Sequence, residues 1–493
     1  MNNINIHEGN NSAIGSGRGI YFFSLFILNI GMARSMGPAG FGSFQQIFIF
    51  SAFFTIFSLG IPETIYLFFP RLDVEEIPAF IGQTLLMLAA AGIMSGVLFW
   101  FTAPIIAGKL GNPSIVTELR VFGVYGTFLI VSTFADPIYI IFKNLKYLFI
   151  LSAFHGLFFI VLTIWQYFTK CSLMTIFVSM SIFGLCKFLL ALWFLKTIKL
   201  SVVKILFLRS RYSILLRLMY AFPVALTLAS DVIFLWLDKF VILFFLGTES
   251  LGIFAAGTGD IPLISVFAVS LYSVIFPKLN SFRVNNNMDE FAKVITKLIK
   301  FSSKIIWPLC LYLFVFADHL IPLVYTEAFS GAVEPFRVYM ILWPLKIIML
   351  GVILTALGQQ RVLLRVYFGS LVLNVFLTVF LVQRIGFLGP AIATAVSTCI
   401  QVMILMWLVL ANLKVRLSEL IPFDTLFYVA LTSGLAGSIS YILTRSYRND
   451  LIAVLMSLTI FVGAYIFIGS KLKMFRIISI MDLLGGDFFG KED

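Results

Sequence analysis

The sequence predicts an all-α integral membrane protein with about 14 transmembrane helices. Of the 493 residues, 60% are hydrophobic and only 12% are charged, and the mean hydropathy is +1.04, whereas about 25% of the residues in soluble domains are charged. A helix needs roughly 20 apolar residues to cross a bilayer, and stretches of that length fill the chain from Gly19 to Gly469. They leave no room for a soluble domain.

Short polar loops separate the fourteen apolar stretches. The first stretch is too long for the core of a signal peptide, so we expect it to be retained as a helix. The four cysteines are isolated and predict neither a disulfide framework nor a metal site. The predicted spans cover residues 19–36, 43–69, 80–107, 119–142, 147–168, 173–195, 218–246, 252–276, 302–324, 336–357, 363–383, 388–410, 421–443 and 451–469.

The distribution of Lys and Arg predicts the orientation of these spans, because basic loops stay on the cytoplasmic side. With the N-terminus inside, and with residues at the ends of spans counted in the adjoining segment, the inner segments hold 24 of the 35 basic residues, the outer segments hold 8, and three lie deeper within helices. We therefore expect both termini in the cytoplasm. The net charge of +12 then reflects topology and attraction to anionic lipid headgroups, and nucleic acid is not expected as a partner.

An internal repeat divides the chain. A pattern of glycines and apolar residues in the loop after the first span returns 210 residues later, after the seventh span: Gly37, Phe41, Gly42 and Phe44 become Gly247, Leu251, Gly252 and Phe254. Because six spans separate the copies, both run in the same direction, as in transporters built from two parallel repeats. Chance similarity between glycines in tight turns is the alternative interpretation.

We therefore expect two six-helix bundles related by a parallel repeat, followed by two extra helices. The expected parts are a cytoplasmic N-terminal tail (1–18), an N-terminal six-helix bundle (19–196), a basic cytoplasmic linker (197–217), a C-terminal six-helix bundle (218–411), two additional transmembrane helices (421–469) and a cytoplasmic C-terminal tail (470–493). Before the ninth span, residues 291–299 carry apolar side chains at helical spacing, which predicts an amphipathic helix lying at the inner interface.

Charged residues inside the apolar stretches predict where the function lies. Each costs about 2.5 to 3.5 kcal/mol at mid-membrane, so eight facing lipid would cost roughly 20 to 28 kcal/mol. They are expected to face protein or a water-filled cavity. The eight are Glu63, Asp136, Lys187, Asp231, Asp238, Lys239, Asp260 and Lys346.

Four of these charges lie beside a proline, which removes a backbone donor and opens the helix. They are Glu63, Asp136, Asp260 and Lys346. An opened helix is tolerated in a membrane only against protein or water, so charge and kink together indicate a polar lumen. The alternative is that the acids pair with Lys187, Lys239 or Lys346 and only hold helices together. His155 is expected to be a packed histidine, and His319 a solvated one at an outer helix end.

Several motifs in this order resemble the polysaccharide flippases of the multidrug/oligosaccharidyl-lipid/polysaccharide exporter superfamily. The resemblance covers roughly residues 18 to 410 and rests on short turn and helix-end motifs: Arg34 to Phe44, Gly60 to Glu63, Pro70 with Arg71, Asp238 with Lys239, Leu251 to Ala255, Phe276 to Lys278 and Gly386 to Ala393. Many members have twelve spans, and the extra pair here is typical of the fourteen-span exopolysaccharide and peptidoglycan-precursor branches.

The resemblance implies a bacterial inner-membrane flippase for undecaprenyl-diphosphate-linked oligosaccharide repeats, of the O-antigen or exopolysaccharide type. Such a protein needs cations for phosphate and hydrogen-bonding groups for sugar. The cations expected in the cavity are Arg34, Lys187, Lys239 and Lys346, and the expected sugar contacts are Asn29, Gln45, Gln46 and Gln401. The acids that would bind a coupling ion or balance charge are Glu63, Asp136, Asp231, Asp238 and Asp260.

The expected coupling ion is H⁺ or Na⁺, and no catalytic residue, metal or other cofactor is expected. The expected partners are the lipid-linked oligosaccharide, membrane lipids, and the polysaccharide polymerase and chain-length machinery. Three alternatives remain open. They are a multidrug or cation antiporter of the same superfamily, a membrane-embedded polysaccharide polymerase or ligase, and a membrane scaffold without transport.

Overall fold

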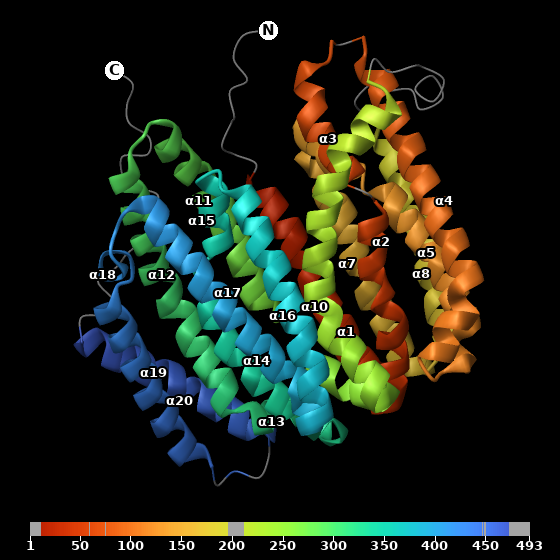
Figure 1. Cartoon of the computed structure of the whole chain (residues 1–493). Coiled ribbons are helices and arrows are strands. Elements are labelled where there is room, and N and C mark those ends of the chain that lie inside the picture. The colour runs from red at the N-terminus through yellow and green to blue at the C-terminus, as the bar shows by residue number, and fades with distance from the viewer. Residues whose placement is uncertain are drawn as a thin grey trace. The chain divides into compact units, whose positions relative to one another are not determined.

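The computed structural model of the chain describes residues 11–58, 60–73, 75–195, 212–445, 447 and 450–472, and all regular structure in these ranges is helical (Figure 1). The first part contains α1 (Asn11–Phe48), α2 (Phe50–Phe57), α3 (Ile61–Phe68), α4 (Ile77–Lys109), α5 (Val116–Ser132), α6 (Ala135–Ile141), α7 (Leu145–Thr169), α8 (Leu173–Leu195) and α10 (Ile214–Gly257), with short 3₁₀ turns η2 (Phe69–Arg71) and η3 (Pro113–Ile115).

The later part of the chain continues the same all-helical pattern. It contains α11 (Pro262–Val284), α12 (Met288–Val315), α13 (Ala317–Val324), α14 (Val333–Lys346), α15 (Leu350–Ala356), α16 (Gln360–Ile385), α17 (Gly389–Leu413), α18 (Leu417–Leu420), α19 (Phe423–Thr444) and α20 (Asp450–Lys471), with 3₁₀ turns η5 (Glu327–Ala332) and η6 (Gly386–Leu388).

The helices agree with the predicted number of spans. Within the described residues, twelve helical stretches are long and apolar enough to cross a membrane. Two of these are too long for a single crossing, because a helix rises about 1.5 Å per residue and the hydrocarbon is about 30 Å thick. Gly19–Phe54 is interrupted at the non-helical Gly37, and Gln360–Leu413 comprises α16 and α17. The prediction of an all-α membrane protein with about 14 spans is confirmed.

Contacts divide the chain into two compact units, one formed by Met1–Ala255 with Gly259–Val266 and the other by Ala256–Thr258 with Phe267–Asp493. In the first unit α1 packs along α7, and α5 lies between α4 and α8. In the second unit α16 packs along α17, and α19 packs against both α12 and α20. The domain limits derived from the sequence stay predictions. Residues 1–10, 196–211 and 473–493, which include most of the predicted tails and linker, lie outside the described residues.

The backbone supports the internal repeat. Gly37 has φ 68° and ψ −179°, and its counterpart Gly247 has φ 83° and ψ −176°. This combination is essentially restricted to glycine. Both glycines interrupt a long helix at the same place in the repeat, and no atom lies within 4 Å of the position that a Cβ would occupy at either residue. The two turns therefore need glycine for its backbone freedom rather than for its small size.

The amphipathic segment before the ninth span is helical, but its apolar face is not open to lipid, as a helix lying at the membrane interface requires. Asn287 caps α12, its side chain accepting a hydrogen bond from the Glu290 nitrogen, and the helix runs without a break into the ninth span. The apolar face of the segment is almost fully buried in a hydrophobic cluster shared with α15, α17 and α18. Protein, rather than lipid, covers this face: Phe291, Val294, Ile295, Leu298 and Ile299 are between 0% and 3% exposed.

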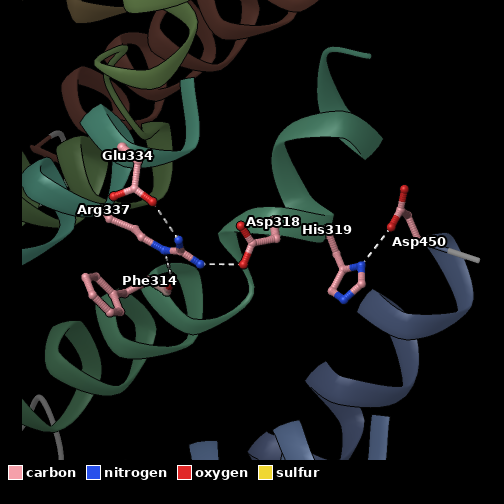
Figure 2. Close-up of polar contacts among 6 residues, drawn as sticks. All are labelled: Phe314, Asp318, His319, Glu334, Arg337 and Asp450. Carbon is pink, nitrogen blue, oxygen red and sulfur yellow. Dashed lines mark hydrogen bonds and ion pairs between the residues drawn. The ribbon is translucent and has the colours of Figure 1, made fainter. Parts of the chain in front are cut away.

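A polar cluster joins α13, α14 and α20 in the second unit (Figure 2). The Arg337 guanidinium contacts Asp318, donates to Glu334 at 3.0 Å, and donates from Nε to the Phe314 carbonyl oxygen at 3.3 Å. His319 Nδ1 lies 2.7 Å from the Asp450 carboxylate, and both side chains are about 30% exposed. His319 therefore remains partly exposed at its helix end and also has a partner on a second helix, which the sequence did not predict.

Candidate functional site

The four charges that accompany prolines all lie at breaks between helices, as expected from the chemistry of proline. Glu63 is in the first turn of α3, after Gly60 in a left-handed conformation, and Asp136 is in the first turn of α6. Asp260 lies in the break that precedes α11. Lys346 is the last residue of α14, before Met349 with φ 56°. The breaks fall in the second, fourth, eighth and tenth predicted spans, which are equivalent positions of the two repeats.

The sign of each charge suits its position on the helix. The N-terminus of a helix carries a partial positive charge and the C-terminus a partial negative one. The three acids lie at or just before N-termini, and Lys346 lies at a C-terminus. Each charge therefore stabilises a helix end at the break, where backbone N–H or C=O groups lack their partners within the helix. Broken helices with free backbone groups are also where transporters bind substrates and ions.

The carboxylates at these breaks differ in exposure. Asp136 and Asp260 are exposed. Glu63 is half-buried, and its Oε2 atom is buried without a hydrogen-bond partner among the described residues. Among the predicted acids whose side chains the structure describes, Glu63 is thus the one with a buried acceptor atom that has no partner.

Lys187 on α8 lies beside His155 on α7. The Lys187 Nζ atom is 3.2 Å from His155 Nδ1, and the imidazole ring is 3% exposed, with Tyr21 on α1 at a ring-centroid distance of 4.9 Å. His155 is packed among aromatic rings as predicted. It also has a basic neighbour, which the sequence did not reveal because the two residues are on different helices. Lys187 is therefore engaged with a histidine in this structure, whereas we expected a cation available for phosphate.

Asp238 and Lys239 form a local pair in α10. Asp238 is 2% exposed, and its Oδ1 accepts from the Lys239 backbone nitrogen at 2.7 Å and lies 3.8 Å from Lys239 Nζ. The ammonium group also lies 5.2 Å from the centroid of the Trp236 ring. These contacts fit the alternative of charge balance for Asp238. The backbone of Asp231 is helical, but its side chain lies outside the described residues.

The predicted sugar contacts of the first unit are amides bonded to other amides. Gln45 Nε2 donates to Asn29 Oδ1 at 2.5 Å, and Asn112 donates to Gln46 Oε1 at 3.1 Å. Gln46 Oε1 also lies within 3.4 Å of the Thr248 hydroxyl. Gln45 and Gln46 are 5% and 0% exposed. In this conformation these amides therefore hold helices together, and a sugar would have to replace their present partners.

The remaining candidates are Arg34 in the first unit and Gln401 and Lys346 in the second. Arg34 is exposed on α1. In the second unit, Gln401 is half-buried on α17, and Lys346 is half-buried with its Nζ 5.7 Å from the centroid of the Trp343 ring. The described structure thus places the candidates in several local contacts, and the predicted single cavity stays a prediction.

Arg217 is a buried cation that the sequence analysis assigned only to the end of the linker. It is 0% exposed, and its guanidinium donates to Thr84 Oγ1 at 2.6 Å and to Thr64 Oγ1 at 3.0 Å. Two weaker contacts go to Gln83 Oε1 at 3.3 Å and the Phe80 carbonyl oxygen at 3.4 Å. All of these acceptors are uncharged. The signal that could have identified it is an arginine one turn into an apolar helix.

The two repeated hairpins touch within the first unit. A Cβ added to Gly252 would lie 2.9 Å from the Gly42 nitrogen and would overlap the Pro38 carbonyl oxygen. A Cβ added to Gly42 would overlap the Thr248 carbonyl oxygen. The glycines that defined the sequence repeat therefore allow the two hairpins to approach at backbone distance. We call this contact, formed by Pro38, Gly42, Thr248 and Gly252, the glycine contact.

The described residues place several polar and charged groups at helix breaks and between helices. Among them, no group of three or more His, Cys, Asp and Glu side chains could hold a metal ion. What the structure assembles is a set of helix breaks with matching charges, a lysine–histidine pair, and amide contacts. These are groups that exchange partners without breaking bonds.

Comparisons with known proteins agree on a family and a fold. The model of the family described as polysaccharide biosynthesis protein matches residues 31–334. A probable low-salt glycan biosynthesis flippase, Agl15 of Haloferax volcanii, is 28% identical over 171 residues, which are 34% of this chain and 36% of that protein. The match thus spans about a third of the relative.

Two solved structures share the fold. The lipid II flippase MurJ in an inward closed conformation has a TM-score of 0.71 at 16% identity, over 93% of this chain and 99% of that chain. An inward-facing multidrug resistance transporter of the MATE family, from the MOP superfamily, has a TM-score of 0.66 at 16% identity, over 80% of this chain and 96% of that chain. At this level of identity the likeness shows the fold alone.

Proposed function

Because this chain belongs to the polysaccharide biosynthesis protein family, we propose that it is a flippase that moves a lipid-linked oligosaccharide from the cytoplasmic to the outer leaflet of the membrane. The match over residues 31–334 is the observation that carries this proposal. It favours a glycan substrate over the drugs of the multidrug exporters, whose likeness to this chain extends to the fold alone.

The proposed substrate is an oligosaccharide repeat unit on undecaprenyl diphosphate. Neither a diphosphate nor a row of sugar hydroxyls can enter hydrocarbon without large loss of hydration, so the headgroup needs a polar route while the polyprenyl tail stays in lipid. Lys239 and Lys346 remain the cations proposed for the diphosphate, together with Arg34. The broken second, fourth, eighth and tenth spans supply backbone groups beside charges, as the binding regions of other transporters do.

The amide side chains in these contacts are proposed to form hydrogen bonds with the sugars of the substrate. Asn29, Gln45 and Gln46 now satisfy one another and nearby groups. A glycan hydroxyl both donates and accepts hydrogen bonds, so it can replace an amide partner at little net cost. Gln401 is the corresponding proposal in the second unit.

The proposed setting is the bacterial inner membrane, with both termini in the cytoplasm and transport driven by exchange with H⁺ or Na⁺. The polysaccharide polymerase and chain-length machinery are proposed as partners that act on the flipped product.

The decisive experiment is a leaflet-resolved assay in proteoliposomes. Purified protein is reconstituted with a fluorescent undecaprenyl-diphosphate oligosaccharide, and a membrane-impermeant glycosidase reports the fraction in the outer leaflet over time. We expect rapid equilibration between leaflets in vesicles with the protein and none in vesicles without it. Equal rates in both kinds of vesicle would refute the proposal, and flipping of a fluorescent drug but not of the glycolipid would favour the multidrug alternative.

A further inference from the structure

The pair formed by Lys187 and His155 contains two basic nitrogens, 3.2 Å apart. A hydrogen bond between them requires one N–H and one lone pair. Two positive charges at this distance repel strongly where water is scarce. The pair therefore holds one exchangeable proton. With that proton it carries a single positive charge, and without it both bases are neutral and one N–H still donates to the other nitrogen.

The pair lies deep within the first unit. His155 is ten residues from the start of α7, and Lys187 is eight residues from the end of α8. At 1.5 Å per residue, His155 lies about 15 Å and Lys187 about 12 Å along its helix from these two ends. The rings of Tyr21, Phe159 and Phe183 surround the imidazole at centroid distances of 4.6 to 5.0 Å. Such surroundings exclude water from one side of the pair.

The two sides of the pair differ in access. The second ring nitrogen of His155, Nε2, is buried and has no hydrogen-bond partner among the described residues. Lys187 is only partly buried. The lysine is therefore the more accessible end of the pair, and the histidine is its interior end.

The titratable groups around the pair come from three other helices. Tyr21 on α1 faces the imidazole, and Tyr125 on α5 packs beside Gly184, the residue that follows Phe183 on α8. Asp136 on α6 is the acidic group in the neighbourhood of Lys187. Asp136 belongs to the first turn after the break between α5 and α6.

From this geometry we propose that Lys187 and His155 form the proton-binding site of the transporter. One proton binds from water on one side of the membrane and leaves to water on the other side in each cycle. No covalent bond other than N–H forms or breaks. The proposal rests on the proposed function and identifies H⁺ as its coupling ion.

The test measures accumulation rather than rate. Proteoliposomes with labelled glycolipid are given a pH difference of one unit across the membrane, acidic on the side that receives the glycolipid. Exchange of one proton per glycolipid drives the ratio between leaflets towards about tenfold, because tenfold in concentration balances one pH unit at a stoichiometry of one to one. Uncoupled flipping gives a ratio near one.

Two substitutions distinguish the loss of proton exchange from the loss of charge or of packing. Lys187→Arg keeps the positive charge and the donor but cannot release a proton in a protein, and His155→Gln keeps hydrogen bonding without titrating. We expect both variants to equilibrate glycolipid without a gradient and to lose the gradient-driven accumulation. His319→Gln is the matched control, because His319 pairs with Asp450 in the second unit, and it should accumulate glycolipid like the native chain.

The outcomes distinguish the two proposals. If native protein flips glycolipid but never accumulates it in a pH gradient, or if Lys187→Arg accumulates it normally, the proton site is refuted and the flippase remains. If native protein flips no glycolipid, the proposed function fails. A second measurement then still tests the site, because the chain has three histidines. In ¹⁵N-histidine-labelled protein in nanodiscs, the His155 signal should change with pH in the native chain and change differently in Lys187→Met, while the His319 signal stays the same. An unaltered His155 titration in Lys187→Met refutes the pair.

Discussion

Gly42 and Gly252, 210 residues apart, lie against each other so closely that neither has room for a Cβ atom. The relationship is reciprocal. Gly42 approaches the Thr248 carbonyl oxygen, and Gly252 approaches that of Pro38, while Pro38 and Thr248 are themselves 210 residues apart. In a symmetric interface, residue i contacts j and residue j contacts i. The glycine contact has this property within one chain. The two repeated hairpins are therefore related by an approximate two-fold symmetry where they touch.

The glycine contact predicts that a methyl group is not tolerated at either position. Gly42→Ala and Gly252→Ala should each destabilise the protein by about 1 to 3 kcal/mol, because the hairpins must separate to make room. The midpoint of thermal denaturation in detergent measures the effect. Gly434→Ala on α19 is the control, since no atom lies within 4 Å of its Cβ position, and it should be neutral or slightly stabilising. Unchanged midpoints for both hairpin variants would contradict the contact.

Gly37 and Gly247 predict a second pair of matched effects with another cause. A Cβ at either residue would meet no atom within 4 Å, but the backbone angles are those of glycine. Alanine should cost of order 1 to 3 kcal/mol at each position through backbone strain. Thermal denaturation of Gly37→Ala and Gly247→Ala checks this, with Gly369→Ala as a helical control that has open space and no positive φ. A loss at one position but not at the other would argue against equivalent turns.

Arg217 predicts an unusual pattern of stabilities, because the acceptors that its buried charge finds among the described residues are all neutral. Replacing a buried charge by an apolar side chain of similar size is often neutral or stabilising, so Arg217→Met should lose little. Thr84→Val should instead cost about 1 to 3 kcal/mol, since it leaves a guanidinium N–H without an acceptor.

A double-mutant cycle checks this explanation of Arg217. In the Arg217→Met background, Thr84→Val should have an effect below about 0.5 kcal/mol, which gives a large coupling energy between the two sites. Additive losses would mean that Thr84 stabilises the protein independently of the arginine.

Lys239 and Lys346 predict losses of transport without loss of protein. A charge-assisted hydrogen bond to phosphate contributes about 1.5 to 3 kcal/mol, so Lys239→Ala and Lys346→Ala should each slow glycolipid flipping about tenfold or more at normal abundance in the membrane. Lys293→Ala is the control, because that lysine is 65% exposed and pairs with Glu290 one turn away. Native flipping rates in both variants would remove the two lysines from the substrate route.

Local sequence determined the spans, the breaks and the repeat. Hydropathy locates the helices because every segment that crosses a bilayer must meet the same requirement. It needs about 20 apolar residues whose backbone groups are hydrogen-bonded within the helix. Proline beside a charge located the helix breaks at Glu63, Asp136, Asp260 and Lys346 because the missing donor acts within one turn of its own helix. The glycine spacing identified the repeated turns because their backbone angles are open to glycine alone.

The tertiary structure decided which side chains meet. Lys187 and His155 are 32 residues apart on different helices, and Arg217 reaches Thr84 across 133 residues. The face of α12 that its periodicity assigned to the membrane interface is covered by α15, α17 and α18. Periodicity sets which residues share a face of a helix, but the rotation and register of one helix against another depend on packing along their whole lengths. Rotation and register place Lys187, which we predicted to bind phosphate, beside His155 in the proposed proton site. They also place Arg217 in the protein interior.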